Sequence, residues 1–164
     1  VAIILAVEFE LHRTAKPNLG YGDVIKEVEA RGGATLKNIR EAICAIRASK
    51  LPDPKVLGNA GSFFKNPIVG AEVAEALLKE YPEMPKYPVP NSSDKVKLAA
   101  GWLIDKAGLK GYRSGSVGVH ERQALVLVNH GGATGDDVIR LSEMVCGAVK
   151  AKFGIEISPE VNIL

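Results

Sequence analysis

Aromatic residues, cysteine, an excess of charge and long apolar runs are all scarce in this 164-residue chain. Aromatics make up 5% of it, which disfavours the base-stacking platforms of single-strand nucleic-acid binders. Lys and Arg number 21 against 19 Asp and Glu, and the charges are dispersed, so no nucleic-acid stripe or polybasic membrane patch is expected. No apolar run approaches the ~20 residues of a membrane-spanning helix. We therefore expect neither nucleic acid nor a membrane as a partner.

The residues that most often bind metals or form disulfides are few and scattered. Cys44 and Cys146 lie in apolar helical patterns without CxxC spacing, which favours free thiols in a reducing compartment and leaves a disulfide between them as the alternative. The three histidines, His12, His120 and His130, are isolated from one another. Because metal sites need clustered ligands, we expect each histidine to be a surface or hydrogen-bonded residue and predict no metal site.

The periodicity of the apolar residues predicts a mixed α+β fold. A hydrophobic content of 46% with 24% charged residues is ordinary for a soluble domain. Thr35 and Thr134 are expected to cap helices, and Gly108 and Gly154 to end them. The segment 82–91 reads as a proline-rich loop. Helices are predicted at 24–30, 35–49, 71–81, 95–107 and 134–153, and strands at 1–11, 115–119, 124–128 and 155–163.

The stretch Gly58–Pro67, GNAGSFFKNP, has the composition of a polar site carried on a rigid turn. Glycines on either side let the backbone approach a ligand closely, and Phe63 and Phe64 can anchor the turn in a core. Ser62 lacks a neighbouring His or Asp and the G-x-S-x-G pattern, so proton transfer is favoured over covalent attack. The alternative is a surface turn that happens to contain Ser and Asn.

Four further residues have a structural interpretation, and all of them except Arg47 also have a functional one. Arg47 and Lys50 end a predicted helix, where basic residues stabilise the helix dipole by ~0.3–1 kcal/mol, but Lys50 also precedes a rigid Pro-Asp-Pro turn and could bind a phosphate. Tyr21, between two glycines on a loop, can either swing in and out or pack on the neighbouring surface. Glu160 follows Pro159, which breaks strand pairing, so its carboxylate points either into a cleft or into solvent.

Several of these segments together resemble one enzyme family. The stretch Gly58–Pro67, preceded by KLPDPK at 50–55, is similar to the signature of UDP-N-acetylenolpyruvoylglucosamine reductase, a flavoenzyme of bacterial cell-wall synthesis. The resemblance continues through KLAAGWLID at 97–105, 120–128 and PEV at 159–161, and so covers nearly all of the chain. The N-terminal, flavin-binding half of the family has no match here.

The resemblance implies a division into three parts. Residues 1–50 would be the C-terminal remnant of the FAD-binding domain, 51–154 the substrate-binding domain, and 155–164 a strand returning to the remnant. Because the chain begins without Met, in what is predicted to be mid-strand, we expect that an upstream segment has been removed, and whether the molecule still holds that half is left open.

The resemblance also implies a reaction. In this family FAD, reduced by NADPH, passes hydride to the enolpyruvyl double bond of a UDP-sugar, giving UDP-N-acetylmuramate for peptidoglycan in the bacterial cytoplasm. Ser62 matches the residue that donates the proton. Glu160 matches a glutamate that, with an arginine, either stabilises the enol intermediate or binds near its carboxylate. Matches to substrate-binding residues are Tyr21, Lys50 and Asn66, and more weakly Gln123 and Arg47.

What this chain does by itself is left open by the resemblance. The catalytic arginine and the glycine-rich flavin loops belong to the unmatched half, so we expect the isolated chain to be inactive and leave open whether it binds FAD. The first hypothesis is an enzyme fragment that supplies substrate binding and the proton donor. The second hypothesis is a non-catalytic UDP-sugar binding module. The third is an α/β protein of unrelated activity that shares the turn.

Overall fold

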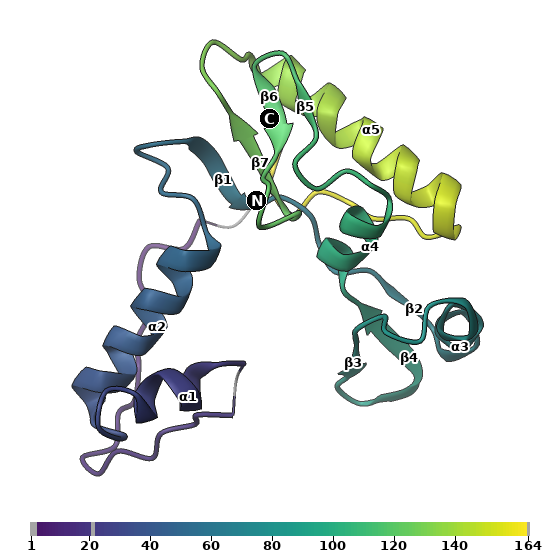
Figure 1. Cartoon of the computed structure of the whole chain (residues 1–164). Coiled ribbons are helices and arrows are strands. Elements are labelled where there is room, and N and C mark those ends of the chain that lie inside the picture. The colour runs from purple at the N-terminus through teal and green to yellow at the C-terminus, as the bar shows by residue number, and fades with distance from the viewer. Residues whose placement is uncertain (1–2, 21, 164) are drawn as a thin grey trace. The chain divides into compact units, whose positions relative to one another are not determined.

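A computed structural model describes residues 3–20 and 22–163, and the chain divides into two compact units, Val1–Ser49 and Lys50–Leu164 (Figure 1). The boundary falls beside the Pro-Asp-Pro turn that follows Lys50. Each unit has its own cluster of buried apolar side chains, so each is described by itself.

The first unit is built on two helices, both of which the periodicity predicted. These are α1 (Val24–Glu29) and α2 (Leu36–Lys50). The predicted cap of α2 is confirmed, because the Thr35 Oγ1 accepts a hydrogen bond from the Asn38 N–H at 3.1 Å. The helices pack through a small core of Val24, Val28 and Ala42, with Leu19, Ile39 and Ile46 at its margin.

The strand predicted at the N-terminus is wrong for the residues that the structure describes. Residues 3–11 have no regular secondary structure, and Ile3, Leu5 and Leu11 are 81%, 91% and 83% exposed. A strand needs a neighbour to satisfy its backbone and a surface to cover its apolar side chains. Among the described residues no strand pairs with this segment, so the alternating pattern alone does not produce a strand here.

A four-stranded antiparallel sheet is the larger element of the second unit. Its order is β1-β7-β6-β5, with the strands at Gly58–Ser62, Val126–Asn129, Val117–Val119 and Arg113–Ser114. Helix α5 (Gly135–Phe153) packs on β6 and β7, as Figure 1 shows. Both predicted ends of α5 are confirmed, because Thr134 forms a capping box with Asp137 and Gly154 adopts a φ of 67°.

A smaller, three-stranded sheet follows β1 in the chain and has the order β2-β4-β3. Strand β2 (Ile68–Gly70) leads directly into α3 (Ala71–Glu80), which packs on β2 and β4 (Figure 1). Strand β3 spans Lys86–Val89, strand β4 spans Ser92–Leu98, and the short helix α4 follows at Ala100–Lys106.

Two predictions for this region were wrong, because pairing between strands decided the structure. The proline-rich loop at 82–91 contains β3, and its Met84 is buried. The helix predicted at 95–107 begins only at Ala100, since β4 extends to Leu98 and pairs with β2 on one side and β3 on the other. The short alternating run at Val96 and Leu98 fits a strand as well as a helix, and the two available partners favour the strand.

The two sheets and the three helices share one core, which confirms the α+β class. Tyr81, Trp102 and Phe153 form an aromatic cluster in which Tyr81 lies 5.6 Å from Trp102 and 5.4 Å from Phe153, centroid to centroid. Residues that are almost completely buried come from every layer: Phe64, Leu98, Leu103, Ile104 and Val145. A shared core gives the second unit a fixed internal geometry on which a site can be positioned.

The strand predicted at 155–163 was wrong, although half of its burial pattern is correct. Ile155 and Ile157 are 4% and 7% exposed and pack in the core of the second unit, but Ile163 is 52% exposed. The only β-pairing found in this segment among the described residues is an isolated bridge at Pro159. Proline donates no hydrogen bond, so the ladder does not continue past it. That residues 155–164 belong to a flavin-binding domain stays a prediction.

Candidate functional site

Ser62 lies at the end of a bulged strand and not in the turn predicted for this stretch. In β1, Asn59 pairs with Val128 and Ser62 pairs with Val126, so β1 has an extra residue between these pairs. Gly61 provides the φ of 73° that this irregularity requires. The Asn59 side chain supports the bulge, since its Oδ1 accepts the Gly61 N–H at 3.0 Å. The bulge leaves the Ser62 side chain exposed on a hydrogen-bonded strand.

The two phenylalanines after Ser62 anchor the stretch in the core, as predicted. Phe63 and Phe64 are 5% and 1% exposed, with ring centroids 5.2 Å apart in an edge-to-face arrangement. The Phe63 N–H also donates to the Leu125 carbonyl at 2.7 Å, directly before β7. Ser62 therefore has an exposed side chain on a backbone that is held by the sheet and the core.

Glu160 is brought to the same stretch by hydrogen bonds of the main chain. The Glu160 N–H donates to the Phe63 carbonyl at 2.8 Å, and the Lys65 N–H donates to the Ser158 carbonyl at 2.9 Å. An isolated antiparallel β-bridge between Phe64 and Pro159 lies between these two hydrogen bonds. Glu160 is exposed, so its carboxylate is accessible beside the segment that follows Ser62.

Asn66 has a structural partner that the sequence did not reveal. Its Oδ1 accepts the N–H of Ala100, the first residue of α4, at 2.9 Å. The amide oxygen is thereby occupied by an otherwise unpaired helix N–H, which fixes the side chain. The amide Nδ2 is a hydrogen-bond donor, and the binding role of Asn66 stays a prediction.

Gln123 lies beside the same end of α4. Its Oε1 is 3.6 Å from the position that a Cβ would take on Gly101, the second residue of that helix. The side chain of Gln123 is half-buried, and its main chain belongs to the turn between β6 and β7. Four predicted site residues therefore gather around β1, its neighbours and the start of α4: Ser62, Asn66, Gln123 and Glu160.

The other three predicted residues are placed less fully. Lys50 is exposed and is the first residue of the second unit. Arg47 is exposed near the end of α2 in the first unit. Tyr21 lies outside the described residues. The catalytic and binding roles of all seven residues stay predictions.

His120, which the sequence analysis treated as an isolated histidine, is buried in the turn that carries Gln123. It is 6% exposed, and its Nδ1 accepts the N–H groups of Arg122 at 3.3 Å and Gln123 at 3.2 Å. Burial lowers the pKa of His120, and the positive charge of Arg122 lowers this pKa further. The prediction of a hydrogen-bonded histidine is confirmed, but no signal in the sequence indicated which groups it bonds.

The remaining expectations concern metal ligands, cysteines and membrane-spanning helices. Within 3–20 and 22–163, no group of three or more His, Cys, Asp or Glu side chains could hold a metal ion. Cys44 and Cys146 are both free thiols, and burial raises the pKa of Cys146. A search of the helices in the described part of the chain found none that is long and apolar enough to cross a membrane.

The second unit is an α+β domain with exposed polar side chains on a backbone that the sheet and the core hold in place. The model of one family, UDP-N-acetylenolpyruvoylglucosamine reductase, C-terminal domain, matches residues 53–164. This chain belongs to that family, which confirms the resemblance found in the sequence.

Individual relatives agree with the family match. The UDP-N-acetylenolpyruvoylglucosamine reductase of Chromobacterium violaceum is 56% identical over 164 residues, covering 99% of this chain and 48% of the relative. The reductase of Bacteroides fragilis is 54% identical over 158 residues, covering 96% and 47%. The chain thus spans about half the length of these relatives. A crystal structure of the Thermus caldophilus reductase is 28% identical, with a TM-score of 0.44, covering 77% of this chain and 34% of that one.

Proposed function

We propose that this chain supplies the substrate-binding part and the proton donor of a reductase that converts UDP-N-acetylglucosamine enolpyruvate to UDP-N-acetylmuramate in the bacterial cytoplasm. The observation that carries the proposal is the backbone framework around residues 62–66. Hydrogen bonds to Leu125 on one side and to the segment 158–160 on the other hold two exposed groups, the Ser62 hydroxyl and the Glu160 carboxylate, on one rigid base. These groups come from distant parts of the sequence, and they are the proposed acid and the group proposed to stabilise the enol.

Ser62 is proposed as the general acid of the reaction. FAD, recharged by NADPH, supplies the hydride when it is bound, and its binding residues are assigned to the half that lies outside this chain. A Cβ built on Gly61, the residue before Ser62, would meet no atom within 4 Å beyond its chain neighbours, so the backbone there faces open space. The Ser62 hydroxyl then gives its proton to the carbon next to the substrate carboxylate. Glu160 is proposed to stabilise the enol form that precedes this step.

The remaining residues are proposed to bind the nucleotide diphosphate. The ammonium group of Lys50 and the Nδ2 donor of Asn66 suit phosphate oxygens, and the half-buried Gln123 offers a carboxamide at the same end of α4. Tyr21 and Arg47 complete the proposed set. Their assignment rests on the resemblance alone.

A UDP-sugar binding module without catalysis is the second candidate. The observation that favours it is the family match, because the model that fits residues 53–164 is that of the C-terminal domain. Both candidates require that the chain bind the UDP-sugar. Only the first requires that Ser62 take part in a chemical step.

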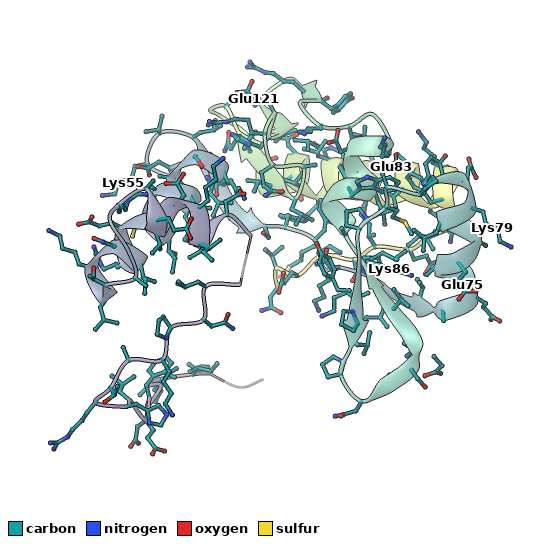
Figure 2. The ribbon with its side chains drawn as sticks, turned by 60° about the horizontal axis from the view of Figure 1, so that its bottom comes forward. Lys55, Glu75, Lys79, Glu83, Lys86 and Glu121 are labelled. Atoms are coloured by element: carbon teal, nitrogen blue, oxygen red, sulfur yellow. The ribbon has the colours of Figure 1, made fainter. Side chains whose placement is uncertain are left out.

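Replacement of Lys50 tests the shared requirement. Lys50→Ala is expected to weaken binding of the UDP-sugar by roughly tenfold, because a charge-assisted hydrogen bond to phosphate is lost. Isothermal titration of the chain measures the dissociation constant. Lys55→Ala is the matched control, since Lys55 is an exposed lysine on the adjacent turn (Figure 2) and should leave the affinity unchanged. Equal affinities for both variants would mean that Lys50 does not bind the phosphate and only stabilises the helix dipole.

A further inference from the structure

The turn between β6 and β7 is organised by a buried imidazole. The Nδ1 of His120 accepts hydrogen bonds from the main-chain N–H groups two and three residues further on, those of Arg122 and Gln123. The same turn is closed by main-chain bonds from the Val126 N–H to the Gln123 carbonyl and from the His120 N–H to the Val126 carbonyl, at 3.0 and 2.9 Å. The position of Gln123 therefore depends on His120 as well as on the sheet.

The acceptor role requires a neutral imidazole. A protonated ring donates from both nitrogens and has no lone pair left for the two N–H groups. His120 is 6% exposed and its pKa is lowered by burial, so the neutral form is the one favoured around neutral pH. The ring is thus suited to hold the turn and unsuited to be a charged ligand group.

We propose that His120 is a positioning residue for the nucleotide site, which fixes the main chain at Gln123 so that the Gln123 carboxamide is aimed along the start of α4 toward the substrate. This inference rests on the proposed function. Its structural basis is the contact that the positioned side chain makes, with Oε1 3.6 Å from the Cβ position of Gly101. The small size of Gly101 matters here, because an added Cβ would also lie 3.3 Å from Leu125 Cγ and crowd this corner.

The test compares two replacements of His120 in the complete reductase. In His120→Asn the Oδ1 lies at the same distance along the side chain as Nδ1 and can accept both N–H groups, as asparagine does in Asx turns. In His120→Leu no acceptor is left. We expect His120→Leu to raise the KM for the UDP-sugar about tenfold with little change in kcat, and His120→Asn to keep both constants near the original values.

The structure offers matched controls for this experiment. Arg122→Ala removes an exposed side chain but keeps the main-chain N–H that His120 binds, so the KM should not change. Gln123→Ala should raise the KM by itself, and adding His120→Leu to it should raise the KM little further, because the two residues act as one unit. If His120→Leu does not fold, His120→Gln replaces it, since its longer side chain carries the acceptor past the two N–H groups.

The outcomes separate this inference from the proposed function. A complete reductase that does not reduce the UDP-sugar would overturn the proposed function, and the inference with it. A working reductase in which His120→Leu leaves the KM unchanged, or in which the effects of His120→Leu and Gln123→Ala simply add, would overturn the inference alone. A raised KM, rescue by asparagine and non-additivity together would support it.

Discussion

Ser62→Ala in the complete reductase is expected to slow reoxidation of the reduced flavin by the UDP-sugar roughly 10²–10⁴-fold, the usual contribution of a positioned acid. The reason is that the methyl group of alanine has no proton to give, while the bulge at Gly61 and the anchors Phe63 and Phe64 keep the backbone in place. Flavin reduction by NADPH should proceed at nearly the original rate, because it needs no proton from Ser62. Stopped-flow absorbance of the flavin measures the two half-reactions separately.

The control for this variant is a serine that is exposed elsewhere in the same unit. Ser93→Ala removes a hydroxyl from β4 and should leave both half-reactions unchanged. Equal slowing of flavin reduction and reoxidation in Ser62→Ala would contradict the acid role and indicate a general disturbance of the site.

Phe64→Ala is expected to lower the free energy of unfolding of the second unit by ~3–5 kcal/mol, the range for truncating a buried phenylalanine. Phe64 is 1% exposed, and its main chain forms the bridge to Pro159 that holds Glu160 near the Ser62 strand. The variant should therefore lose both stability and the geometry of the site. Denaturant unfolding followed by the fluorescence of Trp102, the chain's one tryptophan, reports this unit.

An apolar residue that is not buried provides the comparison. Val56 is 85% exposed in the same unit, so Val56→Ala should change the free energy of unfolding by less than about 0.5 kcal/mol. Similar losses in both variants would mean that Phe64 is not the anchor described above.

Local signals in the sequence were sufficient for some elements of the fold. Helix α5 was predictable because its apolar stripe, its Thr134 cap and its Gly154 stop all act within the helix. The strands β3 and β4 were missed because their structure depends on pairing with each other and with β2, which a local pattern does not contain. The opposite happened at residues 3–11, where a strand pattern has no partner among the described residues.

The site was predictable only in part, for the same reason. The composition around Ser62 indicated a polar site with apolar anchors, and the burial of Phe63 and Phe64 confirms the anchors. That Glu160 lies against this stretch depends on main-chain bonds between distant segments, and it was expected only through the resemblance to a known family. The contacts of His120 were not predictable, because a lone histidine has no local pattern that indicates its partners.

The central claim is that the surface around Ser62, Asn66, Gln123 and Glu160 binds the UDP-sugar, and an NMR titration of the isotope-labelled chain with that substrate tests it most directly. The account predicts saturable shifts of the main-chain amide signals at these four residues. Signals from Glu75 and Lys79, which Figure 2 shows on the exposed side of α3, should stay in place. Saturable shifts confined to other parts of the chain, or none at millimolar substrate, would contradict the account.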